Sequence, residues 1–151
     1  MSDTHAPPAP ALVLRRTYNV SRETLFSAWT KPESARLFLG PDDVTVPEIQ
    51  MDVRVGGTYR IVMLLADGER LVVSGVYREV RRPERLSMTW RWEEDEPEQE
   101  RDTLLSLDFN DVGGATELVL THENFASAES RDRHEHGWTA IMAELQNVSA
   151  G

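Results

Sequence analysis

Apolar residues recur along the chain with two different periods. From Arg131 to Val148 they return every three or four positions, the spacing of one helical face; they are Trp138, Ile141, Met142, Leu145 and Val148. His134 lies one turn before Trp138 and is expected on the same face. Such a face needs a partner, so the pattern predicts a long helix packed on a sheet.

Before this helix, apolar and polar residues alternate at every second position, which predicts a series of strands. The expected strands are 12–20, 44–53, 58–65, 70–82, 85–92, 103–110 and 116–124. Most are separated by turn signals, such as Gly56-Gly57, Asp67-Gly68, Pro83-Glu84 and Gly113-Gly114. Within 44–53 the apolar phase changes at Pro47, which indicates an edge strand or a bulge.

Two short helices are expected between the first two strands. Ser21 is a suitable N-cap, with Glu23 in the first turn. The apolar face of this helix is Leu25, Phe26, Ala28 and Trp29, and Pro32 begins a second helix that ends at Phe38. The order of strand, two short helices, about six strands and long helix predicts an α+β fold, with a curved antiparallel sheet around the C-terminal helix.

The length of 151 residues is typical of one domain, expected here over 11–149. Residues 1–10 are polar and proline-rich and are expected to form a flexible tail. The sequence has no cysteine, which excludes disulfides, thiol nucleophiles and thiolate metal ligands. No stretch approaches the roughly 20 apolar residues of a membrane-spanning helix, so we expect a cytoplasmic protein.

The chain is acidic, with 16 basic and 26 acidic residues and a net charge of −10. Repulsion from phosphate groups therefore disfavours nucleic acid as a partner. Residues 93–102 hold seven of the acidic residues. This stretch is expected to be a solvated hairpin loop, with a protein-recognition segment as the alternative.

Residues spread over most of the chain resemble a known family. They are Phe26, Ala28, Trp29, Thr30, Pro32-Glu33, Asp52, Arg54, Gly56-Gly57, Tyr59-Arg60, Gly75, Tyr77, Glu79, Val80, Pro83, Glu84, Arg85, Leu86, Thr89-Trp90, Thr116, Leu118, Leu120, Thr121, His122 and Gly137-Trp138. On these residues Leu12 to Val148 resembles the SRPBCC or START-like (Bet v 1-like) superfamily, in its branch similar to activators of the heat-shock-protein-90 ATPase. The resemblance implies the helix-grip fold, with seven strands wrapped round the C-terminal helix and a cavity between them.

One stretch departs from the family pattern. Members often carry a tryptophan pair before a Gly-Pro, whereas this chain has Phe38-Leu39 before Gly40-Pro41. We therefore expect a different pocket shape at that end. Many members also resemble only the C-terminal domain of the chaperone activator, so we do not infer chaperone activation from the family name.

Aromatic and methionine side chains are the expected lining of such a cavity, because they offer stacking area and adaptable apolar surface. For any one of them, plain core packing is the simpler interpretation. The candidates are Trp29, Phe38, Tyr59, Met63, Tyr77, Met88, Trp90, Trp92, Trp138 and Met142, with the polar residues Glu79, His122 and His134.

Two polar candidates invite a catalytic interpretation. His122 alternates with apolar residues and is expected to point inward, where it could exchange a proton; the alternative is a histidine satisfied by a backbone carbonyl or Glu123. Glu79 shares its alternation with Gly75 and Tyr77. If that face is inward, its carboxyl is a candidate base, and if outward it pairs with a surface arginine.

No metal or cofactor is expected. His134 and His136 are two residues apart, which points their side chains roughly 200° apart on a helix, so they cannot chelate one ion. Both Gly-Gly pairs lack the flanking pattern of a phosphate loop, and a serine-hydrolase elbow is absent.

Three interpretations of function follow. The first is a binder of a small apolar or amphipathic molecule, held between the C-terminal helix and the sheet. The second is an enzyme, similar to polyketide cyclases or hydrolases, that uses His122 with Glu79 or Tyr77. The third is a protein-interaction module or chaperone accessory that uses the acidic surface and 93–102. We take the first forward, assign no catalytic residue, and leave a homodimer and a chaperone partner open.

Overall fold

The structure, a computed structural model, describes residues 10–40, 43–93 and 102–150, with side chains up to residue 147. Most of the predicted tail 1–10 and of the acidic loop 93–102 lies outside these residues, as does the side chain of Val148.

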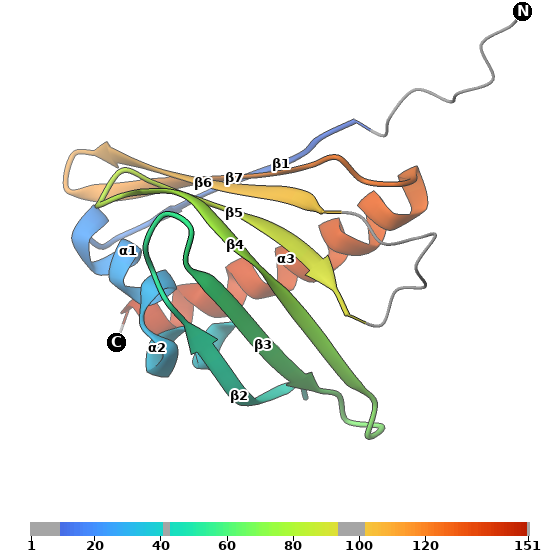
Figure 1. Ribbon diagram of the computed structural model, residues 1–151. Helices are drawn as coiled ribbons and strands as arrows, with labels where there is room; N and C mark the ends of the chain where they lie inside the picture. Colours follow the sequence, from blue (N-terminus) through green and yellow to red (C-terminus); the bar gives the residue numbers. More distant parts are fainter. Residues whose placement is uncertain (1–9, 41–42, 94–101, 151) are drawn as a thin grey trace, which may run out of the picture.

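Seven strands form one curved antiparallel sheet, in the order β1-β7-β6-β5-β4-β3-β2 (Figure 1). They are β1 Leu12–Tyr18, β2 Thr45–Met51, β3 Thr58–Leu64, β4 Arg70–Arg81, β5 Arg85–Trp92, β6 Thr103–Val112 and β7 Ala115–Glu123. From β2 to β7 each strand pairs with the next in sequence, while β1 pairs with β7, so β1 and β2 are the two edges. With the three helices, this confirms the predicted α+β helix-grip fold.

The long C-terminal helix, α3 (Ala128–Ala150), runs across the inner side of the curved sheet (Figure 1). Its predicted apolar face is buried at Trp138, Ile141, Met142 and Leu145. The helix begins three residues before the expected Arg131, because Ser127 caps it: Ser127 Oγ accepts from the Ser130 amide over 3.1 Å.

Two short helices, α1 (Arg22–Thr30) and α2 (Pro32–Phe38), carry the chain from one edge of the sheet to the other. The ring of Phe26 lies 5.3 Å from that of Phe109 on β6, between centroids, and Trp29 lies 4.8 Å from Phe38. Both helices also contact α3. They therefore close one end of the core between α3 and the sheet.

The predicted N-cap of α1 gives the first testable result. Ser21 has extended backbone (φ −69°, ψ 160°), and its Oγ accepts from the Thr24 amide over 3.2 Å. We expect Ser21→Ala to lower the free energy of unfolding by about 1 kcal/mol, because that amide loses its acceptor. Urea denaturation of both proteins measures the loss; Ser21→Asp should restore most of it, and an equal loss in both variants would contradict the cap.

The sheet contains two irregularities in register. One lies between Thr45 and Glu48 on edge strand β2, where Pro47 predicts it. The other lies between Tyr77 and Glu79 on β4, where no proline or glycine marks it. This second bulge shifts the alternation of β4 by one residue, so that Val80 rather than Glu79 packs against the core.

Candidate ligand-binding site

A cavity of about 630 Å³ lies between the N-terminal half of α3 and the sheet. Its volume falls within the roughly 300 to 1,000 Å³ of small-molecule sites. The described residues that line it are Leu39, Val44, Met63, Leu65, Leu71, Trp90, Trp92, Ala126, Ser127, Ser130, Arg133, His134, His136, Gly137, Trp138 and Ile141.

The base of the cavity is apolar and the mouth is polar. Trp90, Trp138 and Met63 are buried in the wall, together with Ile141 and Leu39. The exposed lining residues are Ala126, Ser127, Arg133 and His136. A ligand would therefore meet hydrophobic surface inside and charged or polar side chains at the opening.

Three tryptophans form the aromatic part of the wall. The ring centroid of Trp90 lies 4.9 Å from that of Trp138 and 5.8 Å from that of Trp92, the latter ring at 89° to it. Trp90 and Trp92 share a face because they are two apart on a strand. The indole N–H of Trp90 has no hydrogen-bond partner in the described part of the chain, whereas those of Trp92 and Trp138 donate to histidines.

His122 lies behind this wall, buried, with a partner on each ring nitrogen. The Trp138 indole N–H donates to Nδ1 over 3.0 Å. Nε2 lies 2.6 Å from the Thr103 hydroxyl, which itself donates to the Trp90 carbonyl over 2.7 Å. Because that hydroxyl proton is already used, Nε2 carries the proton and donates to Thr103. Burial, followed by the nearby His134, lowers the pKa of His122 to about 2.

These contacts make His122 a neutral histidine with both nitrogens occupied, and it does not border the cavity. His122 therefore fits the interpretation of a buried histidine whose hydrogen bonds are satisfied, rather than that of a residue that exchanges a proton with a ligand. Its partners are Thr103 and Trp138, not the expected backbone carbonyl or Glu123.

His134 joins α3 to β5 at the cavity. Its Nδ1 donates to the Ser130 carbonyl one turn earlier over 2.8 Å, and Nε2 accepts from the Trp92 indole N–H over 2.9 Å. An indole nitrogen only donates, which assigns the proton of His134 to Nδ1. The edge of the site is therefore held by a hydrogen bond between helix and sheet.

Glu79 faces outward and pairs with arginine, the second of its two alternatives, which corrects its place among the candidate lining residues. The bulge after Tyr77 turns it to the outer face, where its carboxylate pairs with Arg85 at 2.8 Å and Arg81 at 3.6 Å. Arg85 also bridges to Asp108 at 2.7 Å. The Arg85 hydrogen bond holds the pKa of Glu79 below its usual value, so this carboxyl is not a raised-pKa base.

The other predicted lining residues are buried in the core and do not border this cavity; they are Trp29, Phe38, Tyr59, Tyr77, Met88 and Met142. Tyr59 packs over Gly75, where an added Cβ would lie 2.0 Å from the Thr89 carbonyl oxygen. The Tyr59 hydroxyl donates to that same carbonyl. Burial raises the pKa of Tyr77, which keeps its phenol protonated.

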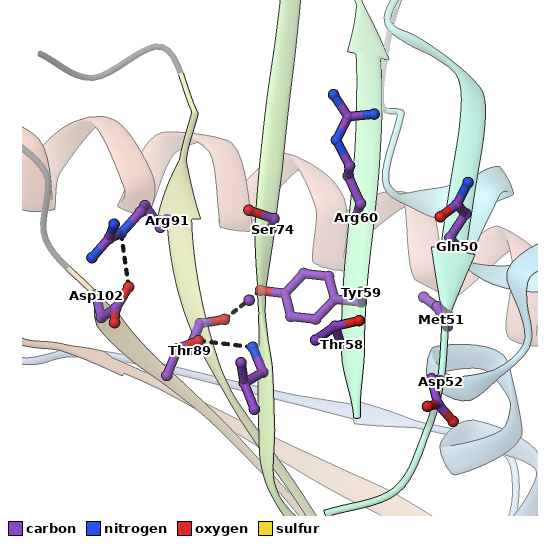
Figure 2. Close-up of a pocket in the computed structure, with 12 residues that line it drawn as sticks. Gln50, Met51, Asp52, Thr58, Tyr59, Arg60, Ser74, Thr89, Arg91 and Asp102 are labelled. Carbon is purple, nitrogen blue, oxygen red and sulfur yellow. Dashed lines mark hydrogen bonds and ion pairs between the residues drawn. The ribbon is translucent and has the colours of Figure 1, made fainter. Parts of the chain in front are cut away.

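A second hollow, of about 660 Å³, lies over β2 to β5 on the outer face of the sheet (Figure 2). There Arg60, Ser74 and Arg91 lie side by side on successive strands, with α3 on the far side. Arg91 pairs with Asp102 at 2.8 Å and Arg60 with Glu93 at 3.0 Å. Both arginines thus have carboxylate partners. Tyr59 is the one aromatic residue among the described residues that line this hollow, against three tryptophans in the inner cavity, so the inner cavity is the better candidate.

Comparison with known proteins decides the family. Residues 19–150 match the model of the AHSA1 family, described as Activator of Hsp90 ATPase homolog 1-like protein. The chain belongs to the AHSA1 family. Among curated proteins no match to this chain is found.

Three solved structures share the fold of this chain. The crystal structure of the AHSA1 protein from Silicibacter pomeroyi is 28% identical, covers 93% of this chain and 98% of that one, and has a TM-score of 0.81. A Chromobacterium violaceum protein shares the fold at 21% identity and a TM-score of 0.83, with 96% and 99% covered. A Rhodobacter sphaeroides protein shares the fold at 22% identity and a TM-score of 0.79, and the match covers 95% of this chain and 96% of that one.

In this AHSA1 chain, Phe38 and Leu39 stand where other members often have two tryptophans. Phe38 packs on Trp29, and Leu39 borders the cavity. Sequence reasoning missed several lining residues on α3, above all Arg133, His136 and Gly137. A helical signal was present, because positions 133 and 137 precede Ile141 at four-residue steps. Those positions are not apolar, so the hydrophobic pattern did not select them.

Two further searches concern only the residues that the structure describes. Within them, no helix is long and apolar enough to cross a bilayer. The same ranges contain no group of three His, Cys, Asp or Glu side chains placed to hold a metal ion.

Proposed function

We propose that this AHSA1-family protein binds a small hydrophobic or lipid-like molecule between α3 and the sheet, with residues 11–149 as a cytoplasmic binding unit. The observation that carries the proposal is the cavity of about 630 Å³ with Trp90, Trp92 and Trp138 in its wall. One water takes up about 30 Å³ in the liquid, so this space is far larger than an isolated packing void. Apolar walls with a few polar groups at one end are typical of ligand sites.

The groups that the enzyme interpretation requires do not favour catalysis. His122 is neutral, with both nitrogens hydrogen-bonded, and Tyr77 is buried with a raised pKa. Glu79 lies on the other face of the sheet, in ion pairs. General acid-base catalysis needs a group near the substrate whose pKa lies near the working pH, and none of these three meets both conditions.

Gly137 offers a way to block the cavity without disturbing the core. It lines the cavity from α3, and a Cβ added there would meet nothing within 4 Å. Glycine inside a helix costs about 1 kcal/mol relative to alanine, so larger residues at 137 should not weaken the helix. Gly137→Leu would extend into the ligand space, whereas Gly137→Ala adds a single methyl group.

We expect a thermal-shift screen of apolar acids, sterols, polyketides and flavonoids to identify compounds that stabilise the wild-type protein. A ligand at 100 times its Kd adds about 2.7 kcal/mol to the folded state, which raises the Tm by roughly 5 to 10 °C for a chain of this size. Gly137→Leu should lose the shift and Gly137→Ala should keep it. The proposal fails if no compound stabilises the wild-type protein, or if Gly137→Leu responds like the wild type.

A further inference from the structure

The described ionisable side chains that line the cavity are all of the basic type, whereas acidic residues predominate in the whole chain. Among the described lining residues, the ionisable side chains are Arg133, His134 and His136, and none is Asp or Glu. The chain as a whole has 26 acidic and 16 basic residues. A carboxylate entering the cavity therefore avoids the repulsion that it would meet over much of this protein's surface.

Arg133 is the residue of this set best placed to meet an anion. It lies at the mouth on an exposed side chain, with His136 three residues later on the same helix. His134 is different, since both its ring nitrogens are engaged with Trp92 and Ser130. A guanidinium binds carboxylates in a planar, bidentate geometry, which suits it to an acid group at the opening.

The ion pair that Arg133 forms with Glu129 does not prevent Arg133 from pairing with a ligand carboxylate instead. The Arg133 guanidinium lies 3.2 Å from Glu129, and the two side chains are 69% and 82% exposed. Exposed pairs of this kind add little stability, because water screens them. Glu129 and Asp132 share a shallow outer hollow with Arg133 and His136, away from the apolar base. A ligand carboxylate anchored by its own apolar body competes with these acids from within the cavity.

We propose that the ligand is an organic acid with a flat apolar body, whose rings pack on Trp90 and Trp138 while its carboxylate pairs with Arg133 at the mouth. This inference rests on the proposed function and adds the ligand's chemical class. Trp90 and Trp138 pack directly on each other, with ring centroids 4.9 Å apart, and so form one aromatic surface, which favours contact with a flat ring over a flexible chain.

The test compares 2-naphthoic acid with 2-naphthalenemethanol, which have the same ring system with and without the charge. Isothermal titration at pH 7.5 and low salt should give a Kd for the acid about two- to fivefold lower than for the alcohol, the range expected for one ion pair at a solvated mouth. Higher salt should narrow this difference, since the pair lies at a solvated mouth. In Arg133→Gln the ratio of the two Kd values should fall to about one.

A matched control separates a direct contact between Arg133 and the ligand carboxylate from the general effect of a positive charge on α3. Arg131→Gln removes the same charge two residues away, from a side chain that pairs with Asp132 and Glu135 and does not line the cavity. It should keep the preference for the acid. Equal affinity of the wild type for acid and alcohol, or loss of the preference in both variants, would overturn the inference while leaving the binding function intact. Failure of the wild type to bind either compound would count against both proposals.

Discussion

Acidification from pH 7 to pH 4.5 is expected to destabilise this protein by about 2 to 3 kcal/mol through His122 alone. The pKa of His122 falls from 6.5 to about 2 on folding, because the ring is buried. Between pH 6.5 and about 2, His122 is protonated in the unfolded chain but stays neutral in the folded chain. The stabilisation is therefore complete above pH 6.5 and is lost as pH falls, by up to about 1.4 kcal/mol per pH unit.

The comparison with His122→Gln isolates this effect, because glutamine can still accept from Trp138 and donate to Thr103 but does not titrate. Urea denaturation at several pH values should show that the free energy of unfolding falls less steeply for the variant than for the wild type between pH 7 and 4.5. Glu79 and Glu93 have lowered pKa values, so their contribution is lost mainly below pH 4.5 and is common to both proteins. Equal slopes, or an NMR titration of His122 near pH 6.5 in the native protein, would contradict a buried neutral ring.

Trp138→Ala is expected to lower the free energy of unfolding by about 4 kcal/mol or more. The side chain is 2% exposed and packs on Trp90 and Trp29, with ring centroids at 4.9 and 6.3 Å. Truncation of a buried tryptophan typically costs about 3 to 5 kcal/mol. It also leaves Nδ1 of buried His122 without its donor, which adds to the loss.

Trp138→Phe separates the packing of the ring from its hydrogen bond. It keeps an aromatic ring but no N–H, and should cost about 1 to 3 kcal/mol. In thermal unfolding, the alanine variant should lose at least about 8 °C in Tm, at roughly 2 °C per kcal/mol for a chain of this length. A loss below about 2 kcal/mol for Trp138→Ala would show that this tryptophan does not hold helix and sheet together.

The helices and strands of the fold were predictable because each has its own local pattern of apolar and polar residues. The helical face of α3 and the turn signals between strands predict most element boundaries to within a few residues. Pro47 also marks its own bulge, since proline cannot donate to a ladder. The bulge between Tyr77 and Glu79 has no such local cause in the sequence, and it reversed the side on which Glu79 lies.

The site was less predictable, because its contacts join residues that are distant in sequence. The partners of His122 are Thr103 and Trp138, 19 and 16 residues away, and the partner of Trp92 is 42 residues away. Alternation predicts which way a side chain points but not what it meets there. The importance of Arg133 likewise depends on its place at a cavity mouth, not on its residue type.

The most direct test of ligand binding in this cavity is an NMR titration of the tryptophan indole signals with 2-naphthoic acid. The chain has four tryptophans, of which Trp90, Trp92 and Trp138 line the cavity and Trp29 does not. We predict that the indole N–H signals of those three move with a common Kd and by more than that of Trp29. Changes confined to the outer face around Arg60, Ser74 and Arg91, or no change at saturating acid, would contradict the account.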